Sequence, residues 1–232
     1  GNHHFDQYWH LSDKSMNKVQ ISEDAQSVLA PHLKLISALE DLKAKLETGY
    51  ISYNYRQKNE APVIRYSLQG KPPVVWPTVL YPFKSKEPDL RFERLMLKMN
   101  NENKDSSGTV ALQLSSAKST DFFFEQEKEK HPYKDEKFET DAKMVFIRFD
   151  PQKRIIGYQM VGGSFLNYHG KKVAQIFGTL TDVSVQSDRV EIEGDDILSF
   201  QLRVPNTPEV FLNEQKIAVT RKDYMISFSR VE

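Results

Sequence analysis

The chain has 232 residues, of which 39% are apolar and 28% are charged, so it can build a core and is too apolar to be a disordered segment. Lysine plus arginine and aspartate plus glutamate both total 32, and this balance gives no long-range attraction to nucleic acid or an anionic membrane, although a local basic cluster could still bind an anionic polysaccharide. Cysteine is absent, which excludes disulfides, zinc-thiolate sites and thiol nucleophiles. No apolar stretch approaches the roughly 18 residues of a membrane span.

The chain opens on GNHHF, where polar residues lead directly into a patterned segment without a signal peptide. A single leading glycine is typical of the remnant left by tag cleavage, so we interpret Gly1 in that way. The sequence therefore predicts an excised piece of a longer protein, and the missing signal peptide says nothing about where that protein resides.

Residues 3–10 read HHFDQYWH and hold three of the six histidines. If this segment is a strand, its side chains alternate between two faces. One face would be polar and the other would pack on a core through Phe5, Trp9 and Leu11. The polar face would carry His4, Asp6, Tyr8 and His10.

Three interpretations of this polar face stay open: a metal site, the lining of a sugar-binding cleft, and an ordinary aromatic strand. His4 and His10 would lie roughly 20 Å apart on a straight strand, too far to share one metal ion. A metal would need His4 with Asp6, or Tyr8 with His10, and a further ligand from elsewhere. We retain His4, Tyr8 and His10 as candidate substrate-binding residues and predict no metal-binding residue.

Residues 33–47, LKLISALEDLKAKLE, have apolar residues at nearly helical spacing and are rich in helix formers. Propensity alone favours a helix. The alternative divides the segment into two strands, LKLIS and LKAKLE, around a Glu-Asp turn.

The rest of the chain is dominated by alternating, β-rich runs separated by turn residues, which is typical of a sandwich. The run at 74–83 is almost continuously apolar, like a strand buried on both faces, but Pro77 and Pro82 favour a sheet edge or a bulge. The expected strands are 19–22, 61–68, 74–83, 108–116, 120–126, 142–150, 155–163, 182–187, 189–194, 197–204, 210–219 and 224–230.

Two polar tracts, 100–108 and 125–139, are expected to be a hairpin loop and a solvated loop. VGGSF at 161–165 lacks the lysine and the following helix of a phosphate-binding loop, so Gly162 and Gly163 are expected to form a turn or bulge. We predict an all-β fold in which large antiparallel sheets stack as a layered sandwich, with residues 1–232 as a single domain.

Four segments occur in an order that resembles the C-terminal β-sheet domain of heparinase II/III-like polysaccharide lyases. They are HHFDQYWHLSD, VQISEDAQSV, PVIRYSLQGKPPVVWPTVLYPF and FETDAKMVFIRFDPQKRIIGYQMVGGSFLNYHGKKV. The resemblance covers about residues 3–174. It also favours the two-strand division of residues 33–47, because the family has strands there.

The resemblance implies that the parent enzyme has an N-terminal α/α toroid and cleaves acidic, uronic-acid-containing glycans such as glycosaminoglycans by β-elimination. A Tyr or His base removes the C5 proton, and polar groups stabilise the charge that develops on the carboxylate. Those residues lie mainly on the toroid, and no position here matches them, so no catalytic residue is predicted. The resemblance also implies a secreted or periplasmic bacterial protein and allows a divalent metal such as zinc in the parent enzyme, with no cofactor in this fragment.

The fragment alone is therefore expected to lack lyase activity and to support the toroid and one wall of the cleft. An alternative is a carbohydrate-binding module, which would need Trp9 or Trp76 exposed beside basic residues such as Arg65, Lys71 or Lys84. A second alternative is a structural or adhesion sandwich without a cleft or an aromatic platform.

Overall fold

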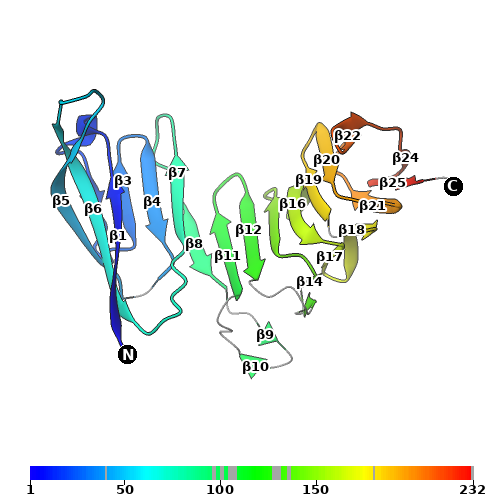
Figure 1. Ribbon diagram of the computed structural model, residues 1–232, viewed down its shortest axis with the longest axis horizontal. Helices are drawn as coiled ribbons and strands as arrows, with labels where there is room; N and C mark the ends of the chain where they lie inside the picture. Colours follow the sequence, from blue (N-terminus) through cyan, green and yellow to red (C-terminus); the bar gives the residue numbers. More distant parts are fainter. Residues whose placement is uncertain are drawn as a thin grey trace. The chain divides into compact units, whose positions relative to one another are not determined.

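The computed structural model describes residues 1–39, 41–95, 98–99, 102–103, 109–126, 132–134, 137–179 and 181–230. Nearly all regular structure in these residues is β, so the predicted all-β class is confirmed (Figure 1). The chain forms two compact units, residues 1–92 and 93–232, which are described one at a time. The expected single domain over 1–232 stays a prediction.

Unit 1 is a small sandwich of two sheets. The first has the strand order β1 (His3–His10), β6 (Asn59–Gly70), β5 (Lys43–Ile51), and all its pairings are antiparallel. The second has the order β2 (Gln20–Ile21), β3 (Ser27–Ala30), β4 (Leu33–Ser37), β7 (Thr78–Pro82). A short 3₁₀ helix, η1 (Asp13–Ser15), follows β1.

The core of unit 1 draws on both of its sheets. Its fully buried side chains include Val28 on β3, Leu35 on β4, and Ile64 and Tyr66 on β6. Strands β1 and β6 present apolar faces to this core, and β5 contributes Ala44, whereas Leu46 on β5 is exposed. Alternation with a period of two produces this arrangement in a two-layer sandwich.

Residues 33–47 form strands rather than a helix. Leu33–Ser37 is β4, which pairs with β3 on one side and β7 on the other, and β5 begins at Lys43. Leu35 and Ile36 are consecutive and both buried, a pattern that suits a strand covered on both faces better than one stripe of a helix. The helix favoured by propensity is therefore wrong, because pairing with β3 and β7 outweighs a weak local preference.

The apolar run at 74–83 is a strand only from Thr78 to Pro82, and it is the edge strand of its sheet. The edge position agrees with the expectation drawn from Pro77 and Pro82, since proline cannot donate to a neighbouring strand. Burial on both faces is not observed, because Leu80 is exposed.

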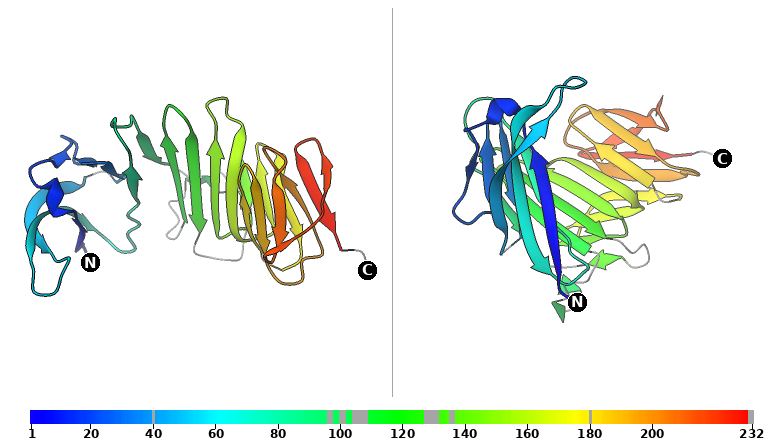
Figure 2. Two further views of the ribbon diagram at one scale, coloured as in Figure 1. Left: turned by 90° about the horizontal axis from the view of Figure 1, so that it is seen from above. Right: turned by 60° about the vertical axis from the view of Figure 1, so that its left-hand side comes forward.

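Unit 2 has two larger sheets (Figures 1 and 2). In the nine-stranded sheet, β20 and β22 are a parallel pair, whereas the neighbours from β11 to β20 and the pair β22 with β23 are antiparallel. Its order is β23 (Gln215–Lys216), β22 (Glu209–Leu212), β20 (Arg189–Glu193), β19 (Thr181–Val185), β16 (Ile155–Gly163), β15 (Met144–Phe149), β12 (Thr120–Gln126), β11 (Thr109–Ser115), β8 (Arg91–Arg94).

The seven-stranded sheet has the order β13 (Tyr133–Lys134), β14 (Phe138–Thr140), β17 (Phe165–Tyr168), β18 (Lys171–Phe177), β21 (Ser199–Arg203), β25 (Met225–Ser229), β24 (Thr220–Lys222). Buried residues of both sheets form one core. Tyr158 on β16 crosses between the layers, where its hydroxyl donates to the Val173 carbonyl on β18 at 3.2 Å. Unit 2 is thus itself a layered sandwich, as predicted for the chain.

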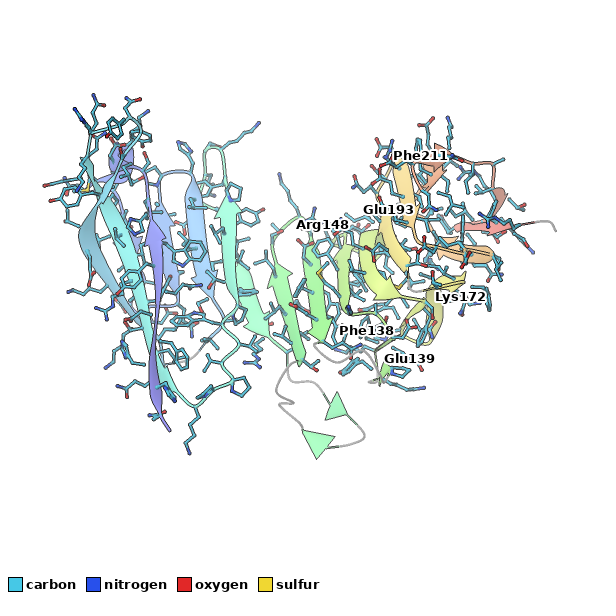
Figure 3. All side chains as sticks on the ribbon, viewed as in Figure 1. Phe138, Glu139, Arg148, Lys172, Glu193 and Phe211 are labelled. Carbon is cyan, nitrogen blue, oxygen red and sulfur yellow. The ribbon has the colours of Figure 1, made fainter. Side chains whose placement is uncertain are left out.

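The predicted bulge and loops have different outcomes. Gly162 has a φ of 62°, and the register of β16 against β19 shifts between Met160 and Gly163, so the bulge is confirmed. The tract at 125–139 is only partly described, but Tyr133 and Phe138 are buried strand residues, so a solvated loop is wrong for that part (Figure 3 labels Phe138). The tract at 100–108 lies outside the described residues except for 102–103, which form β10 and pair with β9 (Lys98–Met99).

Candidate functional site

The strand β1 has the two faces that its sequence predicts. His4, Asp6, Tyr8 and His10 are exposed, whereas Phe5, Gln7 and Trp9 are half-buried. Trp9 packs against the core of unit 1 together with Leu11, which is buried. The polar set therefore lies on the side of the sheet that faces away from the core, which we call the outer face.

The pairing register decides which residues join β1 on the outer face. Opposite His4, Asp6 and Tyr8, the central strand β6 places Gln69, Ser67 and Arg65. Opposite Ser67, Arg65 and Val63, the edge strand β5 places Lys43, Lys45 and Glu47. Directly paired residues point to the same side of a sheet, so three strands contribute polar side chains to the outer face.

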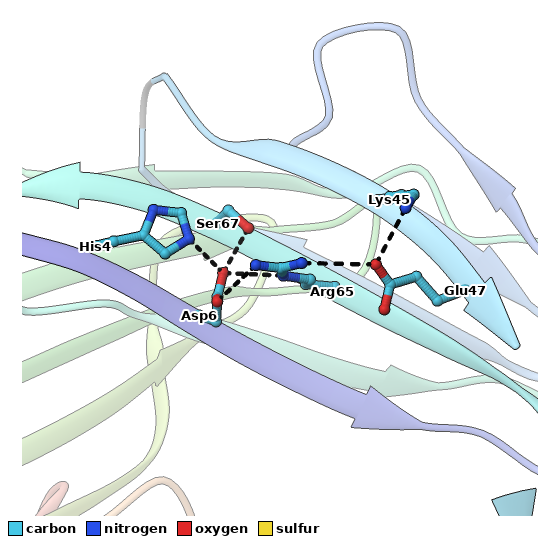
Figure 4. A network of polar contacts seen from close by, with 6 residues as sticks. All are labelled: His4, Asp6, Lys45, Glu47, Arg65 and Ser67. Carbon is cyan, nitrogen blue, oxygen red and sulfur yellow. Dashed lines mark hydrogen bonds and ion pairs between the residues drawn. The ribbon is translucent and has the colours of Figure 1, made fainter. Parts of the chain in front are cut away.

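Asp6 is the centre of a polar network on the outer face (Figure 4). Arg65 donates to it through two nitrogens, Nε at 3.1 Å and Nη2 at 2.8 Å. The Ser67 hydroxyl donates to Asp6 Oδ1 at 2.6 Å, and His4 Nε2 lies 3.0 Å from the same oxygen. The side chains of His4, Asp6, Arg65 and Ser67 thus link strand β1 to strand β6 by hydrogen bonds.

The network continues to the third strand. Arg65 Nη1 is 3.7 Å from Glu47 Oε1, and Lys45 Nζ is 3.4 Å from that oxygen. Three cations, Lys43, Lys45 and Arg65, thus share the outer face with two carboxylates, Asp6 and Glu47. Asp41, which lines a pocket together with His4 and Lys43, balances the remaining positive charge, so recognition of a ligand would depend on individual donors more than on long-range attraction.

The hydrogen bond from Arg65 is the main reason that the pKa of Asp6 falls from its ordinary 3.8 to about 2, and the bond from Ser67 adds to it. Asp6 in turn raises the pKa of Arg65. Both groups are therefore charged at neutral pH. The pair fixes the guanidinium in place and uses two of its five N–H groups.

Tyr8 lies beside this guanidinium. The Arg65 Cζ atom is 5.7 Å from the centre of the Tyr8 ring, a cation–π distance, and the Tyr8 side chain is 49% exposed. A half-exposed ring with a fixed cation at its face can stack on a flat ligand while the cation contacts an anionic substituent. The outer face thus combines an aromatic surface with a positioned charge.

A shallow pocket of about 170 Å³ lies at the His4 end of the outer face. The residues that line it are His4, Asp41, Lys43, Ser67, Leu68 and Gln69. Several of these carry hydrogen-bond donors, and the pocket adjoins the Asp6 network through His4 and Ser67.

The three predicted substrate-binding residues all lie on the outer face, but they are not gathered at one point. His4 contacts Asp6, and Tyr8 contacts Arg65. His10 lies farther along β1 beside Gly49, where a Cβ would come within 3.7 Å of its Cε1 atom. Because β1 is one unbroken strand, His4 and His10 remain roughly 20 Å apart.

Two further observations bear on the alternatives. Trp9 and Trp76 pack against the core of unit 1 with their Nε1 atoms buried, so the tryptophan platform required by the binding-module alternative does not form. Within the described ranges, no group of three or more His, Cys, Asp or Glu side chains is placed to hold a metal ion. The described part of the chain also has no helix long and apolar enough to cross a membrane.

Sequence reasoning did not identify Ser67, Lys45 or Glu47 as members of this face. The signal was present as polar alternation in KAKLE on β5 and in RYSLQ on β6. These patterns identify a shared polar face only when the pairing of β1, β6 and β5 is known.

No protein-family model matches the chain, and no curated protein matches it either.

Proposed function

We propose that this chain is the C-terminal β-sheet part of a heparinase II/III-like polysaccharide lyase, and that its outer face forms one wall of the cleft that holds an acidic glycan. The observation that carries the proposal is the position of Tyr8, half-exposed and with Arg65 fixed at its ring by Asp6. The order of sequence segments from His3 to about residue 174 supports the family assignment.

The chemistry of the outer face suits a uronic-acid ligand. A sugar ring presents an apolar face that can stack on Tyr8, while its carboxylate or sulfate can accept from the remaining N–H groups of Arg65 and from Lys45. His4 and His10 offer further hydrogen-bonding groups on either side. These residues would bind and orient the chain of sugars, and we assign no catalytic residue among them.

The proposal extends to the whole enzyme. An N-terminal α/α toroid on the same parent chain would supply the base that removes the C5 proton and the groups that stabilise the carboxylate. A divalent metal such as zinc, if the parent enzyme binds one, would be held by parent-chain residues other than those of this fragment. We propose a secreted or periplasmic location in a bacterium, where acidic polysaccharides are met outside the cytoplasm.

The test is an assay for the unsaturated uronide product by its ultraviolet absorbance. Chain 1–232 and a longer parent chain are incubated separately with heparin, heparan sulfate, chondroitin and alginate. We expect product from the parent chain alone. Product from chain 1–232, or no product from the parent on any of the four, would contradict the proposal.

A variant of the parent chain tests the role of the outer face. Tyr8→Ala should raise KM about tenfold and leave kcat within about twofold, because stacking on Tyr8 contributes equally to the bound substrate and to the transition state. Phe146→Ala, which removes the ring beside Arg148 in unit 2, is the matched control and should change neither constant. A fall in kcat with an unchanged KM would instead give Tyr8 a role in the chemistry.

A carbohydrate-binding module without lyase activity is the second candidate. The exposed Tyr8 beside Arg65 offers this candidate a tyrosine platform in place of the tryptophan platform, which does not form. Binding of acidic oligosaccharides by a parent chain that makes no product would select this candidate.

A further inference from the structure

The turn of the β5–β6 hairpin, taken as the last two residues of β5, the connecting loop and the first residue of β6, has an unusual composition. Residues 50–59, YISYNYRQKN, contain three tyrosines, one arginine and one lysine, and no carboxylate. The loop lies at the end of the hairpin away from the N-terminus of β1 (Figure 1). It is separate from the Asp6 network, since Arg65 and Asn59 are six residues apart on β6, or roughly 20 Å.

All three tyrosines expose their rings. Tyr55 is 87% exposed, Tyr53 61% and Tyr50 58%. Single exposed apolar residues are ordinary on a protein surface, but three large rings within six residues form a cluster that marks an interaction site. Tyrosine suits such a site because its ring provides apolar area and its hydroxyl stays hydrated.

Each of two rings has a cation at its face. Lys58 Nζ lies 5.8 Å from the centre of the Tyr50 ring, and Arg56 Cζ lies 5.2 Å from that of Tyr55. Both distances are within the cation–π range. The loop therefore repeats, twice, the combination of aromatic ring and adjacent cation found at Tyr8 and Arg65.

Hydrogen bonds connect the loop to η1 and close a turn within it. The Tyr53 hydroxyl donates to Asp13 Oδ1 at 3.0 Å, and Asn59 Nδ2 donates to Asp13 Oδ2 at 3.0 Å, so both ends of the loop are tied to η1. Within the loop, the Gln57 N–H donates to the Asn54 carbonyl at 3.2 Å and closes a turn. An ordered loop loses less conformational entropy when it binds, which favours affinity.

We propose that this tyrosine loop, with Tyr50, Tyr55, Arg56 and Lys58 as its contact residues, is a second binding site for the acidic glycan. Sugar rings would stack on Tyr50 and Tyr55, and carboxylates or sulfates would pair with Lys58 and Arg56. Tyr53 acts as a positioning residue through Asp13. The inference rests on the proposed function for the identity of the ligand, but it concerns a site that the outer face does not include.

Arg56 and Lys58 are the two charged side chains of residues 50–59, and they favour a polyanion over a neutral sugar, while Glu60 lies opposite Tyr50 in the register and Asp13 accepts from Tyr53 and Asn59. Neutral glycans can stack on tyrosine and accept hydrogen bonds from Arg56 and Lys58, but only an anionic group forms an ion pair with these cations. Binding of an acidic glycan at the loop should therefore weaken as salt is raised from about 0.05 to about 0.5 M, because exposed charges are screened.

Isothermal titration of chain 1–232 with a heparan sulfate oligosaccharide tests the site. Tyr55→Ala should weaken binding about tenfold, equivalent to about 1.4 kcal/mol. Arg56→Gln with Lys58→Gln should weaken it by a similar factor and reduce its salt dependence. Tyr224→Ala is the matched control: Tyr224 is also exposed, with Arg203 Cζ 5.8 Å from its ring, but it lies in unit 2, and its loss should leave affinity unchanged.

The outcomes separate this proposal from the proposed function. Loss of binding in Tyr8→Ala but not in Tyr55→Ala overturns the tyrosine loop and leaves the outer face as the glycan site. Equal loss in Tyr55→Ala and Tyr224→Ala also overturns it. If chain 1–232 binds anionic phospholipid vesicles and no heparan sulfate, the loop is a membrane contact and the glycan proposal for it is wrong, whatever the parent chain does in the product assay.

Discussion

Each unit carries an arginine–aspartate pair between neighbouring strands, and the two pairs are closely alike in geometry. Arg148 donates to Asp121 through Nε and Nη2, both at 2.7 Å, and its Cζ lies 5.5 Å from the Phe146 ring (Figure 3 labels Arg148). Arg65 makes the same two bonds to Asp6 and lies beside Tyr8. The bidentate pair by itself is therefore no mark of a binding site.

The difference lies in what surrounds each pair. Asp121 and Arg148 are direct partners in the register of β12 and β15, which is the usual arrangement of a stabilising cross-strand pair. Asp6 and Arg65 are diagonal, so Asp6 also accepts from Ser67, and the ring beside Arg65 is the half-exposed tyrosine Tyr8, whereas the ring beside Arg148 is Phe146. The comparison teaches that a candidate site is recognised by which groups surround an ion pair, and three predictions can break or sharpen it.

The largest expected effect tests whether the two units are independent in function. Phe124 is fully buried in unit 2, where its ring lies 4.9 Å from that of Tyr133 and 5.0 Å from that of Phe138. Phe124→Ala should lower the free energy of unfolding of unit 2 by about 3–5 kcal/mol, measured by denaturant titration, because it leaves a cavity in a packed core.

Phe177→Ala is the control, because Phe177 is exposed and its loss should change stability little. Acidic-glycan binding at 25 °C should survive in Phe124→Ala as long as unit 2 stays folded. Loss of binding in folded Phe124→Ala would place the glycan site in unit 2, and the contrast between the two ion pairs would fail.

An intermediate effect is expected from the arginines themselves. Arg65→Gln should weaken binding of an acidic oligosaccharide about fivefold to tenfold, since it removes the fixed cation beside Tyr8. Arg148→Gln removes an equivalent pair and should leave the affinity unchanged. Titration calorimetry measures the affinity of both variants for the oligosaccharide. Equal affinities would show that the groups around Asp6 do not contribute to glycan binding.

The smallest effect concerns pH. The pKa of Asp6 in the folded protein is about 2, below its ordinary 3.8. A lowered pKa means that ionised Asp6 stabilises the fold above about pH 4 and that this contribution is lost as pH falls towards 2. The stability difference between the wild type and Asp6→Asn should shrink over that range. Carboxyl NMR should give Asp6 a midpoint near 2, whereas a midpoint near 3.8 would mean that Arg65 does not hold it.

Much of the outer face was predictable from sequence, because alternation in HHFDQYWH assigns His4, Asp6 and Tyr8 to one side without any knowledge of partners. The partners were not predictable: Arg65 and Ser67 lie about 60 residues away, and no local pattern specifies which strand pairs with β1. The same limit explains why propensity favoured a helix at residues 33–47 and why the sequence alone did not decide how far Trp9 and Trp76 are exposed, although alternation assigned Trp9 to the core side. Their burial depends on the second sheet of unit 1, which is a tertiary property.

The most direct test of the central claim is amide NMR of chain 1–232 during titration with a heparan sulfate oligosaccharide. The account predicts that chemical-shift changes concentrate on β1, β6 and β5, around Asp6, Tyr8 and Arg65, with a second group in the tyrosine loop, and that Asp121 and Arg148 are unaffected. Changes confined to unit 2, or no changes with any acidic glycan, would contradict the claim that the outer face binds these polysaccharides.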